Sequence, residues 1–193
     1  IYGGNGTDTI YGDNGANSVA GGNDTIYGGR GKDKISGDGG NDVLKGEKGS
    51  DTINGGYGDD IIVGGEAADI LTGGPGKDTF VFNAKFDISR DDDDDCDVED
   101  GKLRSDSTLN NMDVITDFVR GEDKIDLTSL LGTSDLNWGN TTPTANGVWY
   151  KAIDGNTYVY ADIDGNPATP ELAIKLDGIH NLSNADFLGV KNA

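Results

Sequence analysis

The chain has 193 residues with 35 acidic and 15 basic side chains, which gives a net charge of −20. This charge excludes nucleic acid as an obvious partner, and no stretch has the apolar length of a membrane span. A chain this acidic repels itself, so bound divalent cations would stabilise its compact state. The single cysteine, Cys96, excludes an internal disulfide. The chain begins inside a repeat and shows no cleavable signal peptide, so we expect a piece of a longer protein.

Residues 3–81 repeat a short phrase nine times: GGNGTDTIY, GDNGANSVA, GGNDTIY, GGRGKDKIS, GDGGNDVLK, GEKGSDTIN, GGYGDDIIV, GGEAADILT and GGPGKDTFV. Glycine at the first and fourth places allows a turn with φ > 0 at little steric cost. The eighth place is always apolar. A fixed period this short predicts an all-β solenoid, in which each loop-and-strand unit buries its apolar residue against its neighbours. A flexible Gly/Asp-rich linker is the alternative, but a linker does not keep an apolar residue at every eighth place.

The sixth place carries the candidate metal ligands. It is acidic in every phrase except the second, which has Asn17; the acids are Asp8, Asp24, Asp33, Asp42, Asp51, Asp60, Asp69 and Asp78. Because two phrases make one coil, turns two phrases apart should stack and bring two carboxylates together with backbone carbonyls. Such an all-oxygen cage favours Ca²⁺ over Mg²⁺, which demands strict octahedral geometry. The expected carbonyl ligands are those of Gly28, Arg30, Gly37, Gly39, Gly46, Lys48, Gly55, Tyr57, Gly64 and Glu66.

This stacking predicts seven pairs: Asp8–Asp24, Asp24–Asp42, Asp42–Asp60 and Asp60–Asp78 on one edge, then Asn17–Asp33, Asp33–Asp51 and Asp51–Asp69 on the other. Three features weaken some of them. The third phrase, residues 21–27, is two residues short, Asn17 is neutral, and Ala67 replaces a glycine before Asp69. The best-supported pairs are Asp33–Asp51, Asp42–Asp60 and Asp60–Asp78.

The nonapeptides resemble the repeats-in-toxin (RTX) β-roll of bacterial proteins exported by the type I route. The later sequences GGPGKDTFVF, DVITDFVRGEDKIDL and LSNADFLGV resemble the C-terminal domain of serralysin-type proteases. Related ends occur on some secreted lipases, alginate epimerases and large adhesins. The resemblance implies a parallel β-roll, calcium-dependent folding, a C-terminal secretion signal and a secreted or cell-surface location in a Gram-negative bacterium.

Along the chain, we expect a roll over residues 1–82, an acidic loop over 83–112 and an antiparallel β domain with a short helix over 113–193. Thr79–Asn83 should close the roll, with Phe80 and Phe82 as its lid. The acidic run Asp91–Asp100 is either a solvated loop or a further cation site.

Residues 113–131 are predicted to form a hairpin, because apolar and acidic places alternate on both sides of RGED. Its acids are Asp113, Asp117, Asp123 and Asp126. They are expected on the solvent face of the strands rather than in acid/base catalysis.

Three Asp-Gly pairs, 154–155, 164–165 and 177–178, predict turns of an antiparallel sheet. Trp149, Tyr158 and Tyr160 supply either packing area or a sugar-binding face. Asp162 and Asp164 are either turn residues or ligands of one more calcium ion. Ser183 and Asp186 have the spacing of a capping box for a helix over 183–188.

The sequence contains no catalytic constellation: His180 is the only histidine, and neither HExxH nor GxSxG occurs. Three functions remain open. The first is a non-catalytic calcium-binding module that folds on meeting extracellular calcium and supports type I secretion, with calcium and the secretion apparatus as partners. The second is a carbohydrate-binding module of the alginate type, and the third is the terminal stalk of an RTX adhesin.

Overall fold

The computed structural model describes residues 1–13, 21–85, 104–105, 107–130 and 136–191. Half of these residues form strands, and the one helical element among them is a single 3-10 turn, η1. The roll strands are β1 (Tyr2–Asn5), β2 (Thr9–Tyr11), β3 (Thr25–Arg30), β4 (Lys34–Gly39), β5 (Val43–Lys48), β6 (Thr52–Tyr57), β7 (Ile61–Glu66), β8 (Ile70–Thr72) and β9 (Thr79–Val81). The later elements are β10 (Ala84–Lys85), β11 (Arg104–Ser105), β12 (Asp113–Ile115), β13 (Lys124–Asp126), β14 (Leu136–Asn140), β15 (Gly147–Ile153), β16 (Asn156–Ala161), β17 (Leu172–Leu176), η1 (Asn184–Asp186), β18 (Phe187–Leu188) and β19 (Val190–Lys191).

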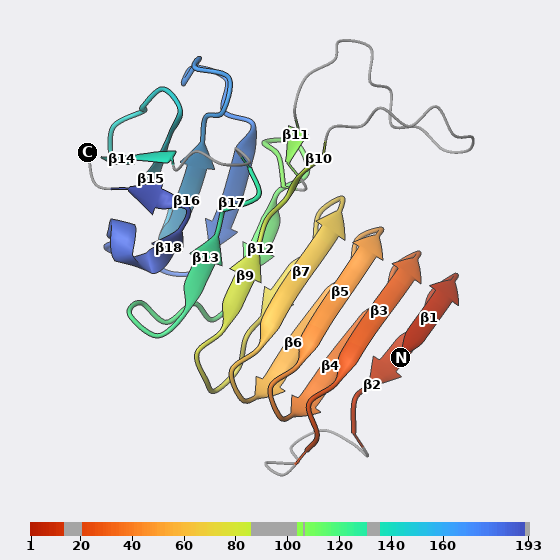
Figure 1. Cartoon of the computed structure of the whole chain (residues 1–193). Helices are drawn as coiled ribbons and strands as arrows, with labels where there is room; N and C mark the ends of the chain where they lie inside the picture. Colours follow the sequence, from red (N-terminus) through yellow and green to blue (C-terminus); the bar gives the residue numbers. More distant parts are fainter. Residues whose placement is uncertain (14–20, 86–103, 106, 131–135, 192–193) are drawn as a thin grey trace.

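Successive repeats alternate between two sheets, as a β-roll requires (Figure 1). One sheet has the order β1-β3-β5-β7-β9-β13-β18 and is parallel throughout. The other has the order β19-β14-β15-β16-β17-β12-β8-β6-β4-β2. Within the repeats, one coil is 18 residues long, since Ile35 lies opposite Ile53. The predicted all-β fold with a parallel roll is confirmed.

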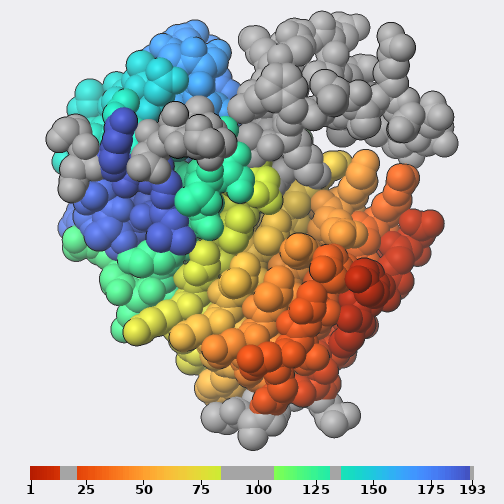
Figure 2. All heavy atoms as spheres, viewed as in Figure 1, coloured from red at the N-terminus to blue at the C-terminus, as the bar shows by residue number. Residues whose placement is uncertain are grey.

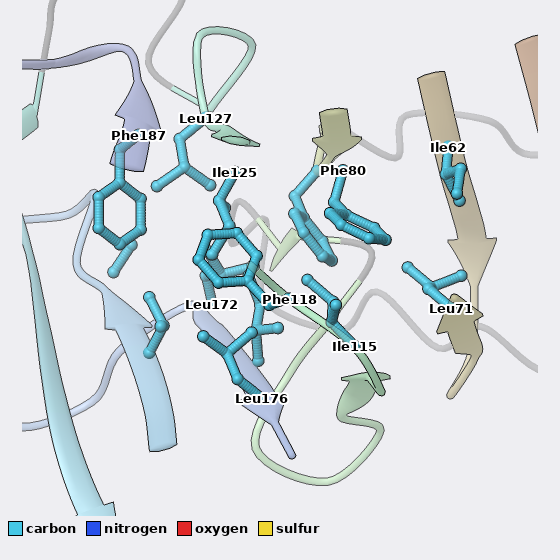
Figure 3. Packing of buried hydrophobic residues seen from close by; sticks show 14 of the residues in the cluster. Ile62, Leu71, Phe80, Ile115, Phe118, Ile125, Leu127, Leu172, Leu176 and Phe187 are labelled. Atoms are coloured by element: carbon cyan, nitrogen blue, oxygen red, sulfur yellow. The ribbon is translucent and has the colours of Figure 1, made fainter. Parts of the chain in front are cut away.

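The eighth-place side chains form the core of the roll. They point inward and stack into one ladder per sheet, because only alternate residues of a strand face the same side. Residues 113–191 extend both ladders, since Ile125 pairs with Phe80 and Phe187, and Ile115 pairs with Leu71 and Leu176. The ladders are Ile26–Leu44–Ile62–Phe80–Ile125–Phe187 and Ile10–Ile35–Ile53–Leu71–Ile115–Leu176, all buried. Figure 3 shows the part of this core where the roll passes into the C-terminal strands.

The predicted hairpin over residues 113–131 is wrong. β12 pairs in parallel with β8 and β17, and β13 pairs in parallel with β9 and β18. The two strands therefore add one more coil instead of pairing with each other, because the end of the repeats leaves an unpaired strand edge on each sheet. For the same reason Phe80 and Phe82 are not a lid: both are buried, and β13 covers the edge of β9. In Figure 2 the bands of successive coils continue directly into the C-terminal residues.

The antiparallel sheet predicted for the C-terminal part is confirmed for β15, β16 and β17. It is wrong for β14, which pairs in parallel with β15 and β19. Asp154 and Gly155 join β15 to β16 with positive φ at both residues (49° and 80°), as a tight hairpin turn demands. Trp149 lies opposite Tyr160 with their rings stacked at 5.8 Å, so these aromatics pack across strands. The second Asp-Gly pair lies within a ten-residue connection, 162–171, between β16 and β17.

The predicted helix over 183–188 is only the 3-10 turn η1. Ser183 begins it as expected, because the Asp186 carboxylate accepts hydrogen bonds from the Ser183 N–H (2.7 Å) and hydroxyl (3.0 Å). It ends at Asp186 because Phe187 joins β18 and pairs with Ile125. The described part of the chain holds no helical segment with the length and hydropathy of a membrane span. The division into three segments stays a prediction, and the run Asp91–Asp100 lies outside the described residues.

Candidate calcium sites

The sixth-place aspartates line both edges of the roll, each immediately before a strand. Their position follows from the repeat, because the glycine-rich turn ends at the fifth place and the apolar eighth place must point inward. The side chains are buried despite their charge: Asp33, Asp42, Asp51, Asp60, Asp69 and Asp78 are at most 2% exposed. Buried carboxylates require partners, and the structure shows what each oxygen contacts.

One oxygen of each carboxylate holds neighbouring coils together. The Asp42 N–H donates to Asp60 Oδ1 (2.8 Å), and the Asp60 N–H donates to Asp78 Oδ1 (2.9 Å). The same bond links Asp33 to Asp51 (2.8 Å) and Asp51 to Asp69 (2.7 Å). Each acid therefore stacks on the acid one coil away, as predicted for the best-supported pairs.

The other oxygen, Oδ2, is itself buried and receives no hydrogen bond from any described residue in the following acids: Asp8, Asp33, Asp42, Asp51, Asp60 and Asp78. A buried anionic oxygen without a donor is costly, at about 1–3 kcal/mol or more for a charged group. A cation supplies the missing partner. These orphaned oxygens are the observation in the structure that fits a bound metal ion.

The first-place glycines keep the space beside Oδ2 open. A Cβ on Gly28 would lie 2.7 Å from both Asp33 Oδ2 and the carbonyl oxygen of Gly46. The equivalent Cβ on Gly55 would overlap Asp60 Oδ2 and the Gly73 carbonyl oxygen. The space that glycine leaves is thus lined by a carboxylate oxygen and a carbonyl oxygen from the next coil. This donor set suits a hard cation of flexible coordination, such as Ca²⁺.

The predicted carbonyl ligands fall into two groups. The first-place carbonyls of Gly46, Gly55 and Gly64 face the first-place glycines of the preceding coil. Four of the five third-place carbonyls each accept a hydrogen bond from a backbone N–H one coil earlier, namely those of Arg30, Lys48, Tyr57 and Glu66. The fifth, that of Gly39, faces Gly21. The latter oxygens help to hold the coils in register, and which carbonyls contact an ion stays a prediction.

The folded roll disfavours the charged form of its own carboxylates, as their raised pKa values show. Burial is the main cause that raises the pKa of Asp60 and of Asp78 to about 7, and that of Asp51 to about 6. Carboxylates one coil away raise these pKa values further, while the backbone hydrogen bonds oppose the shift. A bound cation reverses this balance by stabilising the charged form.

The pairing predicted at the N-terminal end is wrong. The Asp8 N–H donates to Asp33 Oδ1 (2.8 Å), so Asp8 does not stack on Asp24, and Asp33 has Asp8 instead of Asn17 as its neighbour on this side. Tyr2 lies opposite Tyr27, a coil of 25 residues where later coils have 18. This coil is therefore seven residues longer than the later ones. Residues 14–20, Asn17 included, lie outside the described residues.

Two other doubts about the repeat are resolved. Asp24, from the short third phrase, stacks on Asp42 as predicted, with an N–H to Oδ1 distance of 2.8 Å. Ala67 adopts φ 82°, a strained value for a residue with a Cβ. The turn nevertheless keeps its shape, since the Asp51 N–H still reaches Asp69 Oδ1.

Sequence reasoning missed two acids beyond the repeats. The Asp69 N–H donates to Asp113 Oδ1 (2.8 Å), and the Asp78 N–H donates to Asp123 Oδ1 (3.0 Å). Both acids are buried, at 0% and 2% exposed, so the prediction that they lie on a solvent face is wrong. Asp117 caps the turn beside them by accepting the N–H groups of Gly73 and Gly74. The sequence did carry a signal for these two acids. The tripeptides DVI (113–115) and DKI (123–125) have the same pattern as the sixth, seventh and eighth places of the nonapeptide.

Comparison with known families agrees with this geometry. The model of the RTX calcium-binding nonapeptide repeat matches residues 1–19, 19–53 and 45–80, and that of the peptidase M10 serralysin C-terminal domain matches 102–189. No curated protein matches the chain at a significant level.

Solved structures of similar proteins include two subunits of a mannuronan C5-epimerase from Azotobacter vinelandii. The AlgE6R2 subunit is 26% identical, with 97% of this chain and 91% of the subunit covered and a TM-score of 0.46. The AlgE6R3 subunit is 25% identical, with 91% and 85% covered and a TM-score of 0.38.

Proposed function

Given that this chain carries RTX calcium-binding repeats followed by a serralysin C-terminal domain, we propose that it is a module that calcium switches from an unfolded to a folded state on export. In this proposal it accompanies a larger protein through a type I secretion apparatus. Calcium binding is the established part, and both regions are typical of secreted bacterial proteins.

The orphaned Oδ2 atoms are the observation that carries the proposal. Without cations, the roll buries stacked carboxylates whose neighbours are other carboxylates. The folded state is then opposed by desolvation and by repulsion between charges. Because the sites exist only where coils stack, the free energy of calcium binding is also free energy of folding.

The size of the free energy that calcium binding can supply supports a folding switch. Sites of the extracellular class have dissociation constants of roughly 10⁻⁴–10⁻³ M, so they stay empty in a calcium-poor cytosol. When the calcium concentration is about ten to a hundred times the dissociation constant, one site adds about 1.4–2.7 kcal/mol to the free energy of unfolding. Four filled sites together contribute about 6–11 kcal/mol, which is comparable to the whole stability of a typical domain.

Circular dichroism against free calcium tests the switch. We expect a steep, cooperative gain of β signal, shifted to higher calcium when Asp42, Asp60 and Asp78 are changed to Ala. A chain equally ordered in EGTA would show that calcium does not drive folding. For export, the chain fused behind a reporter should carry it into the medium only in cells that have a type I exporter; equal release without the exporter would refute that part.

A second candidate, carbohydrate binding, is favoured by a groove of about 570 Å³ beside β1, β3 and β5. Tyr2 and Tyr27 stack there at 4.7 Å, and Lys45 Nζ lies 5.2 Å from the centre of the Tyr27 ring. Arg30 and Lys48 also line the groove. An aromatic platform beside cations suits an acidic sugar chain. Calorimetry with alginate oligosaccharides in calcium is the test: binding that Tyr27→Ala with Lys45→Ala abolishes supports this function, and no heat in the wild type refutes it.

A further inference from the structure

A second kind of acidic cluster lies in the connection 162–171, which joins β16 to β17 far from the N-terminal coils (Figure 1). Asp162 directly follows β16 and Glu171 directly precedes β17, whose facing ends pair through Ala161 and Leu172. The hairpin therefore brings both acids to one place. One carboxylate oxygen from each of Asp162, Asp164 and Glu171 lies within 4.8 Å of the other two.

Asp162 shows why this cluster is more than a group of surface acids. Its side chain is 0% exposed, and its Oδ2 accepts the N–H groups of Asn146 (2.5 Å) and Gly165 (3.1 Å). Its other oxygen, Oδ1, is buried and receives no hydrogen bond within the described part of the chain. This is the same signature as in the roll: one carboxylate oxygen fixed by backbone donors and the second one orphaned.

The three acids also add negative charge to one another. Within the described part of the chain, no lysine or arginine forms an ion pair with Asp162 or Asp164. Burial, together with the charges of Asp164 and Asp162, raises the pKa of Glu171. Three carboxyl groups this close repel one another at neutral pH, and a cation between them removes the repulsion.

We propose that Asp162, Asp164 and Glu171 bind one calcium ion outside the roll. Three carboxylates without histidine or cysteine select a hard cation, and ligands from an irregular loop suit Ca²⁺ better than the strict octahedron of Mg²⁺. The site differs from those of the roll, since all its side chains come from one hairpin connection and none from stacked coils. Bound calcium fixes the two ends of this connection and so stabilises the β15–β16–β17 meander, which continues into β12 of the roll sheet.

The ion content of a double variant tests the site. Asp164→Asn with Glu171→Gln removes two charges and leaves the buried Asp162, whose Oδ2 holds the backbone, unchanged. Asp154→Asn is the matched control, because Asp154 is an exposed acid in the preceding Asp-Gly turn. After dialysis against saturating calcium, mass spectrometry of bound metal should find one ion fewer per chain in the double variant and the wild-type number in the control. An unchanged number in the double variant overturns the proposal, whether or not the roll switches with calcium.

Terbium luminescence gives a second measurement that depends little on the roll. Both tryptophans, Trp138 in β14 and Trp149 in β15, lie outside the nonapeptides. We expect tryptophan excitation of the wild type to produce sensitised Tb³⁺ emission. The single variant Asp164→Asn changes only an exposed ligand, so the fold is retained, and about ten times more Tb³⁺ should be needed for half-maximal emission. Emission from this variant at wild-type Tb³⁺ concentrations overturns the proposal.

Discussion

The change Asp60→Asn should stabilise the calcium-free protein and destabilise the calcium-loaded one. Asn keeps the Oδ1 atom that accepts the Asp42 N–H, so the hydrogen bond between coils survives. It removes the charge on the orphaned oxygen, and with it one anionic ligand. The stability of the two states therefore changes in opposite directions. Without calcium the buried charge destabilises the fold, whereas with calcium the same charge binds the ion.

The magnitude without calcium follows from the pKa of Asp60, which burial raises from 3.8 to about 7. A raised pKa in the folded state means that this state prefers the protonated acid, so the stability of the calcium-free protein falls as the pH rises from about 4 to 7. At neutral pH the charged group costs about 4 kcal/mol, at 1.36 kcal/mol for each pKa unit. Asn avoids this cost.

The magnitude with calcium follows from the two stacks that Asp60 joins, with Asp42 and with Asp78. If both neighbouring sites empty, the loss is about 3–5 kcal/mol at calcium concentrations of ten to a hundred times the dissociation constant. This exceeds the effect of an ordinary surface substitution, which is within about 0.5 kcal/mol.

Two titrations followed by circular dichroism measure these effects. In EGTA, Asp60→Asn should fold at a lower concentration of the stabilising osmolyte trimethylamine N-oxide than the wild type does. In saturating calcium, it should unfold at a lower urea concentration. Asp59→Asn is the control, because Asp59 is exposed and its Oδ1, which accepts the Lys77 N–H, is retained. A variant that is destabilised in both conditions would refute the view that the buried charge opposes folding without calcium.

Three further predictions concern the stacked aspartates of the calcium sites. Gly55→Ala places a Cβ against Asp60 Oδ2 and the Gly73 carbonyl, so calorimetry should show at least one lost site, whereas Gly22→Ala, with nothing within 4 Å, should bind calcium normally. Asp123→Asn should raise the calcium midpoint of folding several-fold, although Asp123 lies beyond the nonapeptides. The control Glu122→Gln changes an exposed acid and should leave the midpoint unchanged. Equal midpoints for the two variants would exclude Asp123 from the sites. Lowering the pH from about 7.5 to 5.5 should weaken calcium binding to the folded roll, because protons compete for carboxyls whose pKa is near 7, and an affinity that is constant over this range would contradict the raised pKa values.

The sequence by itself determined the repeating part of this protein. Each nine-residue unit contacts only its neighbours, so glycine at the turn, aspartate at the sixth place and an apolar eighth place specify the coil wherever they recur. The stacks from Asp24 to Asp78 and the buried ladder from Ile26 to Phe80 could therefore be predicted without a structure, as could the choice of calcium.

Only the tertiary structure decided which distant segments join these stacks. The pattern Asp-x-Ile that begins at Asp113 and at Asp123 is compatible both with a hairpin and with a further coil, so the sequence alone does not distinguish them. The coil forms because β8 and β9 offer unpaired edges, a fact about the assembled roll rather than about the local sequence. In the same way, the seven extra residues near the N-terminus move Asp8 onto Asp33, and the closure of one hairpin brings Glu171 to Asp162. Local periodicity fixes the geometry of a unit, but packing between units fixes the register across long connections.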